Sequence, residues 1–320
     1  MKKKIWSLAT MVVMAVAFGV LNSSCSSDGD GGTLSEPEYS DVSAKYNIGS
    51  SSPYSSIELT ESGHYVVTLN SAQAKTRASE EEDNTLPTLF VANAQEAFTR
   101  GTNYGNVIYG KYTKNEDGSF QLEGFGTVVI SQSSGTYYSL NITLDNGTTL
   151  NYPATKTVQQ EGKTKTIQLC RTWKIRQLNL VATMEGYGTV YNGSVQNGDL
   201  PRLMKNMLQH AWELDGNSGS MPEYYINKID NTYSIVESIT FTQTGTYLVL
   251  YEGDKLGVAT WTWQNIDTGL LHYSWDYTNM SSQALSGDVS ISIQGNRCVM
   301  KEKSSSNNVD FLMTYTLVEE

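Results

Sequence analysis

Acidic residues outnumber basic ones in this 320-residue chain, which has 33 Asp and Glu against 22 Lys and Arg and a formal net charge of −11. Proteins that bind nucleic acid depend on clustered basic residues, so we expect no nucleic-acid partner. Twenty tyrosines, six tryptophans and 27 glycines, with only 17% charged residues, are typical of short twisted strands joined by tight turns. The composition therefore predicts an exported all-β protein.

Residues 1–24 have the pattern of an export signal. Three lysines at positions 2–4 precede an apolar run over 5–21, which is short for a membrane-spanning helix, and small residues precede Cys25. Removing this segment takes away three lysines and no acidic residue, so the rest of the chain has a net charge of about −14. Because that charge disfavours contact with anionic lipid head groups, we expect membrane attachment to be covalent.

The sequence Asn22-Ser23-Ser24-Cys25 and the acidic, glycine-rich stretch after it resemble the cleavage site and tether of Bacteroidetes-type lipoproteins. The resemblance implies that Cys25 carries a lipid anchor, that residues 25–40 form a disordered tether, and that the protein lies on the outer membrane at the cell surface. The periplasmic face is the alternative location. An ordinary secretory signal with an incidental cysteine is the alternative interpretation of the segment.

The chain beyond the signal is long enough for two domains of ordinary size. We expect a first β domain over 41–155, a polar linker over 156–166 and a second β domain over 167–320. An insertion over 71–103 interrupts the first domain, and its acidic and apolar runs predict an exposed loop followed by a short helix. Such an insertion is a place for partner contacts.

Alternation and turn signals, including the hairpin pair Asn146-Gly147, predict an antiparallel meander in the first domain. Its strands are expected near 56–60, 64–70, 107–114, 119–123, 127–132, 136–144 and 148–153.

Residues 56–67 and 238–249 repeat each other, with six of twelve positions identical and no gap. In each segment alternating apolar residues flank a turn glycine, Gly63 or Gly245, which predicts a β-hairpin. A second echo follows downstream, where Tyr112 corresponds to Trp261. Two echoes in the same order predict one duplicated fold in both halves, and chance similarity between short hairpins is the alternative.

The second domain shows the clearer pattern, eight strands joined by short connections that form an antiparallel meander. Eight strands can close into a barrel that removes exposed sheet edges, and an open barrel is the alternative. Asp199 and Pro201 introduce a stretch, 200–213, with apolar residues at helical spacing, which predicts an inserted amphipathic helix that plugs the barrel or packs on its side. The strands are expected near 168–182, 235–243, 246–252, 256–264, 269–276, 287–294, 297–303 and 309–318.

Arg171-Thr172-Trp173 at the opening of the first strand, with Gly245-Thr246-Tyr247 and Trp261 in the meander, resembles the lipocalin-like domains of Bacteroidetes lipoproteins. The resemblance covers about 150 residues. It implies a barrel fold and an envelope location, in a family whose members are mostly of unknown function.

Besides Cys25, the chain has two cysteines that could form a disulfide, Cys170 and Cys298. Their expected strands are separated by one neighbour, and two strand spacings of about 4.8 Å exceed the roughly 7 Å limit for a disulfide, so two buried thiols are expected. The three histidines, His64, His210 and His272, fall in a hairpin, a helix and a strand, without the spacing of a metal site. We expect no metal, cofactor or catalytic residue.

A cluster of aromatic side chains on adjacent strands forms the candidate ligand site. Alternation places its members on common faces, where they could stack on sugar rings or line an apolar cavity. Filling of the barrel interior is the competing interpretation. The cluster consists of Trp261, Trp263, Tyr273, Trp275 and Tyr277.

The leading hypothesis is a surface-anchored, non-enzymatic binding or protein-interaction lipoprotein with a glycan, protein or small-molecule partner. The alternatives are a carrier of a small apolar ligand, an assembly or adhesion component that uses sheet edges or the 71–103 insertion, and a divergent hydrolase.

Overall fold

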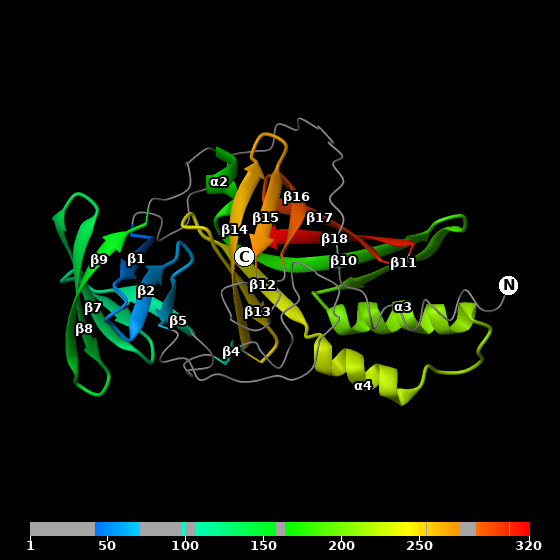
Figure 1. Cartoon of the computed structure of the whole chain (residues 1–320), viewed down its shortest axis with the longest axis horizontal. Helices are drawn as coiled ribbons and strands as arrows, with labels where there is room; N and C mark the ends of the chain where they lie inside the picture. The colour runs from blue at the N-terminus through cyan, green and yellow to red at the C-terminus, as the bar shows by residue number, and fades with distance from the viewer. Residues whose placement is uncertain are drawn as a thin grey trace.

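The computed structural model describes residues 42–70, 98–99, 107–157, 164–253, 255–274, 286–306 and 308–320. Within them the chain forms two antiparallel β-barrels in tandem, which confirms the predicted all-β fold (Figure 1). The predicted signal, Cys25, the tether and the loop and helix expected in the 71–103 insertion lie outside the described residues. So do the expected aromatic positions Trp275 and Tyr277.

Barrel 1 is closed by pairing between its first strand and its last, where Tyr46 lies opposite Lys156. The first strand was not expected, because its five residues are too short for periodicity to distinguish them from the polar segment before them. The eight strands, in order around the barrel, are β1 Ala44–Ile48, β2 Tyr54–Leu59, β3 His64–Leu69, β5 Val107–Lys114, β6 Phe120–Leu122, β7 Gly126–Ser134, β8 Tyr137–Leu144 and β9 Thr149–Lys156.

Barrel 2 is closed through β10, which pairs with β12 along one edge and with β18 along the other. All eight expected strands are present. They are β10 Thr172–Met184, β12 Val236–Phe241, β13 Thr246–Tyr251, β14 Lys255–Asn265, β15 Leu270–Ser274, β16 Ser286–Gln294, β17 Arg297–Ser306 and β18 Val309–Glu319. A two-residue strand, β4 Phe98–Thr99, comes from the predicted insertion of barrel 1 and pairs with the start of β14.

Strand β10 is longer than the barrel needs. From Gln177 to Met184 it pairs with β11, Gly188–Gln196, a strand that the sequence pattern did not reveal. Helices α3, Leu200–Leu214, and α4, Glu223–Thr232, follow it (Figure 1). We call the β10–β11 hairpin and these two helices the arm. It projects along the long axis of the molecule, away from barrel 1.

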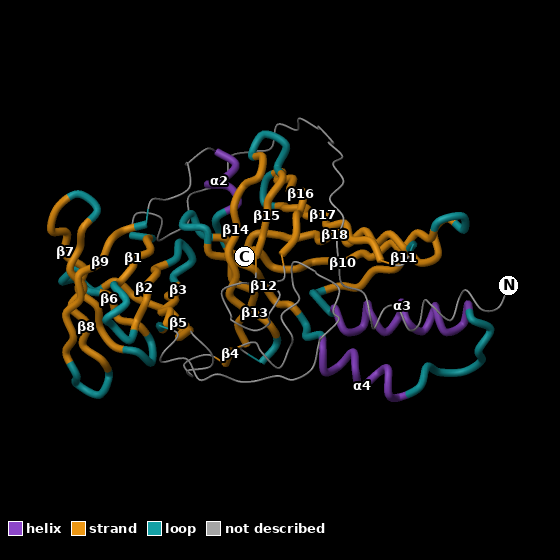
Figure 2. The backbone as a smooth tube through the Cα atoms, viewed as in Figure 1, coloured by secondary structure: helices purple, strands orange, loops and turns teal. Residues whose placement is uncertain are grey.

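Helix α3 confirms the helix predicted at 200–213. The Asp199 side chain accepts a hydrogen bond from the Arg202 backbone N–H at 3.1 Å, and Pro201 lies in the first turn. The helix packs on the side, against β10 and β11. Helix α4 was not expected, and neither was α2, Thr164–Leu169, which begins inside the predicted linker. Among the residues that the structure describes, helix occurs in α2 and in α3 and α4 of the arm (Figure 2).

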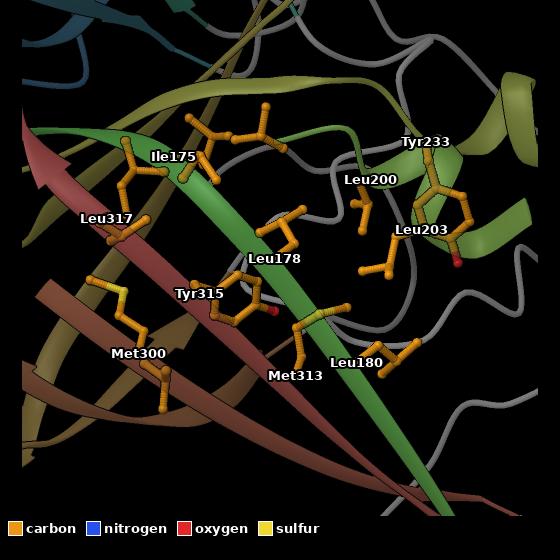
Figure 3. Packing of buried hydrophobic residues seen from close by; sticks show 14 of the residues in the cluster. Ile175, Leu178, Leu180, Leu200, Leu203, Tyr233, Met300, Met313, Tyr315 and Leu317 are labelled. Atoms are coloured by element: carbon orange, nitrogen blue, oxygen red, sulfur yellow. The ribbon is translucent and has the colours of Figure 1, made fainter. Parts of the chain in front are cut away.

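One hydrophobic core runs from barrel 2 into the arm. Leu178 and Leu180 on β10 face Leu203 of α3 on one side and Tyr315 of β18 on the other, and all four side chains are buried (Figure 3). Burial of this continuous surface, at about 25 cal/mol per Å², holds the arm to the barrel. The arm is therefore an integral part of the second domain.

Candidate functional site

The aromatic cluster lies inside barrel 2. Trp261 is 3% exposed and Tyr273 is fully buried, while Trp263 is half-buried. The rings of Trp261 and Trp263 meet edge to face with centroids 5.6 Å apart, so alternation correctly placed them on a common face. Their indole N–H groups donate to the Thr242 carbonyl at 3.0 Å and the Thr166 hydroxyl at 3.0 Å. The described members of the cluster are thus engaged by the protein's own core.

A buried carboxylate lies beside these rings. Glu302, on β17, is 5% exposed and accepts hydrogen bonds of 2.5 Å from the hydroxyls of both Tyr273 and Tyr315. Burial and the neighbouring Glu302 charge raise the pKa values of these two tyrosines well above the usual value. A buried carboxylate is tolerated because both of its oxygens are hydrogen-bonded. Sequence reasoning missed this group, because nothing in the pattern of β17 distinguishes an inward-facing glutamate.

The two echoed hairpins meet each other between the barrels. In each hairpin the backbone carbonyl of the turn threonine, Thr60 or Thr242, accepts a hydrogen bond from the backbone N–H of the turn glycine, at 3.2 and 3.1 Å. In each, an aromatic donor from the next strand reaches the carbonyl of that threonine: the Tyr112 hydroxyl donates to Thr60 at 2.9 Å, and the Trp261 indole donates to Thr242 at 3.0 Å. The second echo, Tyr112 with Trp261, therefore marks structurally equivalent positions.

The interface itself pairs equivalent positions of the two barrels. Pairing registers place Val66, Val107 and Tyr109 of barrel 1 where Leu248, Leu256 and Val258 lie in barrel 2. These six side chains form one buried cluster, distinct from both barrel cores. The same surface patch on each half meets its counterpart, which is the arrangement of an isologous dimer contained in one chain.

Glu58 of barrel 1 reaches into the second hairpin. Its carboxylate accepts hydrogen bonds from the hydroxyls of Thr242 at 2.9 Å, of Thr246 at 2.6 Å and of Thr244. The ammonium group of Lys45 lies 3.7 Å away. Glu58 is 1% exposed, so these partners replace the water that a carboxylate requires. Barrel 2 has Thr240 at the position equivalent to Glu58, so the polar contact is made from one side only.

The arm carries large apolar side chains that face solvent. Tyr187 at the β10–β11 turn is 63% exposed, Tyr224 in the first turn of α4 is 68% exposed, and Leu214 at the end of α3 is 45% exposed. The rings of Tyr191 on β11 and His210 on α3 have centroids 5.8 Å apart, which ties the helix to the hairpin. The hairpin turn and the α3–α4 connection lie at the same end of the molecule (Figure 1).

The remaining candidates for chemistry have structural partners. His64 lies in the first hairpin, His210 in α3 and His272 in β15, as expected, and the His272 ring is 2.7 Å from Asp288. In the described residues no group of three or more His, Cys, Asp or Glu side chains is arranged to hold a metal ion. Cys170 and Cys298 are buried free thiols, as expected, but Cys170 lies in the bend between α2 and β10 and not in the strand expected at 168–182, because α2 occupies the residues before it.

No protein-family model matches this chain, and no curated protein matches it significantly. The lipocalin-like character of the chain therefore rests on its barrel fold, and the lipoprotein interpretation on residues 1–40. No helix of the described segments is long and apolar enough to span a bilayer.

Proposed function

We propose that the protein is a non-enzymatic binding lipoprotein, anchored through Cys25 at the surface of the outer membrane, that engages a protein partner through the arm. The observation that carries the proposal is the filling of the barrel interiors by the chain's own side chains. Trp173, Tyr247 and Tyr251 fill barrel 2, and Tyr65 fills barrel 1, each less than 2% exposed. Because large rings occupy these interiors, binding is assigned to the outer surface.

The arm supports the assignment to a protein partner. Exposed tyrosines supply large, rigid contact areas at low entropic cost, which is why they are enriched in interaction surfaces. Strand β11 adds a sheet edge, since its only partner in the described residues is β10. Its nine residues contain no charged side chain and no proline, the usual guards against edge pairing. An extended segment of a partner could add to this edge.

A photo-crosslinking experiment in the native host tests the proposal. A crosslinking amino acid replaces Tyr187 or Tyr224 on the arm and, as a matched control, Tyr137 on the opposite barrel, which is 62% exposed. We expect a discrete crosslinked protein from the two arm positions and none from Tyr137. Equal crosslinking from all three positions, or none from the arm, would contradict an arm-specific partner.

The anchor and the carrier alternative require separate measurements. Fatty-acid labelling that is lost in Cys25→Ser, together with protease sensitivity of the chain on intact cells, is expected for a surface lipoprotein. Native mass spectrometry of the Cys25→Ser chain, purified from envelope extract, addresses the carrier. A retained small molecule of defined mass would favour the carrier over the interaction module.

A further inference from the structure

A second acidic side chain lies between the barrels, and its environment differs from that of Glu58. Glu61, in the turn of the first hairpin, is 1% exposed. Its Oε1 atom accepts from the Ser43 hydroxyl and from the backbone N–H of Gln243 in barrel 2, both at 3.2 Å. Its Oε2 atom is buried and has no hydrogen-bond partner among the described residues.

An ionised carboxylate is poorly suited to this environment. Burial without full hydrogen bonding penalises the charged form, and the carboxylate of Glu58 adds repulsion. Burial, with the Glu58 charge as a smaller contribution, raises the pKa of Glu61 from 4.5 to about 7. Part of that burial comes from barrel 2, because the Gln243 turn contacts the Glu61 carboxyl group directly.

We propose that Glu61 makes the joint between the two barrels sensitive to pH: the carboxylic acid stays packed against the Thr242–Gly245 turn, and ionisation weakens the contact. The sign follows from linkage. The pKa of Glu61 is higher when the barrels are packed together than when they are apart. Its neutral form therefore stabilises the packed state fully below pH 4.5, and this stabilisation is lost as the pH rises through about 7. The two pKa values allow at most a roughly 300-fold change in the equilibrium between packed and parted barrels.

Other charged and titratable groups surround the joint. Lys45 on β1 and Glu58 on β2 form an ion pair on the barrel 1 side. On the barrel 2 side Cys170 interacts electrostatically with Glu61, and the neighbouring Arg171 guanidinium pairs with Glu319. His64, at the start of β3, contacts Ser62 in the same turn as Glu61. Its ring is the competing source of a pH effect in this range.

Hydrogen exchange of the purified chain between pH 5 and pH 8, corrected for intrinsic rates, tests the proposal. The reporter is the peptide that contains the Gln243 amide, and the reference is strand β17, Arg297–Ser306, within the core of barrel 2. We expect protection of the reporter relative to the reference to fall by 10-fold or more from pH 5 to pH 8. A ratio that does not change with pH would overturn the proposal.

Two variants separate Glu61 from its neighbours. Glu61→Gln keeps the shape of the neutral carboxyl group and should keep high protection at every pH. Glu116→Gln, which removes an exposed acidic group from a turn of the same barrel, should retain the wild-type pH dependence. The same fall in protection in Glu61→Gln as in the wild type would assign the effect to another group, such as His64, and overturn the proposal.

Discussion

The two barrels share one strand order and differ in what interrupts it. Barrel 1 has its long insertion between β3 and β5, whereas barrel 2 has the arm between β10 and β12. The hairpin that faces the other barrel is uninterrupted in both. The β2–β3 and β12–β13 hairpins therefore share one geometry, whereas the connection to the next interface strand differs: it is short between β13 and β14 and is the long insertion between β3 and β5.

The interiors differ as well. Pairing registers place Tyr46 of barrel 1 at the position of Trp173 in barrel 2, and Ile142 at the position of Glu302. Barrel 2 thus combines larger rings with a buried carboxylate, and barrel 1 has an aliphatic side chain at the corresponding place. The comparison shows that one barrel architecture accommodates either an apolar interior or a fully hydrogen-bonded polar cluster.

The largest expected effect comes from removing the central ring of barrel 2. Trp173→Ala deletes a fully buried indole whose N–H donates to the Leu169 carbonyl at 2.9 Å, and should cost about 3–5 kcal/mol of unfolding free energy. Tyr46→Ala, the equivalent change in barrel 1, should cost less because the ring is smaller. Denaturant titration followed by far-UV circular dichroism measures both losses, because it reports on the strands of both barrels; tryptophan fluorescence reports on barrel 2 alone, since all five tryptophans after the signal lie in the second half. An equal or larger loss in Tyr46→Ala would contradict the comparison.

An intermediate effect is expected when barrel 2 receives the residue of barrel 1. Glu302→Ile leaves the buried hydroxyls of Tyr273 and Tyr315 without their acceptor and should cost about 2–3 kcal/mol. Adding Tyr273→Phe and Tyr315→Phe removes the stranded hydroxyls, so the triple variant should recover to within about 1 kcal/mol of the wild type. Denaturation midpoints at neutral pH check both statements. A triple variant that is less stable than Glu302→Ile would contradict this expectation, because the two hydroxyls would then stabilise the fold even without the Glu302 carboxylate.

The smallest effects concern the paired turns. Tyr112→Phe removes the hydroxyl that donates to the Thr60 carbonyl and should cost about 1 kcal/mol. Trp261→Phe removes the equivalent donor and leaves unfilled volume, so its cost should be about 2 kcal/mol. Hydrogen exchange of the Gly63 and Gly245 turn amides measures each loss locally. If a variant lowers the exchange protection of its own turn no more than that of the other turn, the removed donor does not stabilise the turn to which it is bonded.

Part of the site could be predicted from the sequence. Alternation placed Trp261 and Trp263 on a common face, with filling of the barrel interior as one of two interpretations, and Asp199 and Pro201 predicted the start of α3. Strand β11 could not be predicted, because its polar and small residues lack alternation, and its pairing depends on the extra length of β10. Gly198 contributes to this arrangement: its φ of 71° turns the chain, and a Cβ there would lie 1.8 Å from the Val236 carbonyl oxygen.

The sequence by itself determined the all-β class, the eight strands of the second domain and the repeated hairpin, because these depend on local alternation and turn residues. Only the tertiary structure decided which barrel positions face each other and which acidic groups are buried between them. In the sequence Glu58 is the polar residue between Ile57 and Leu59 of an alternating strand, and Glu61 is an ordinary residue of a polar turn. Their burial arises from contacts with Thr242 and Gln243, more than 180 positions away, and no local pattern encodes a pairing at that separation.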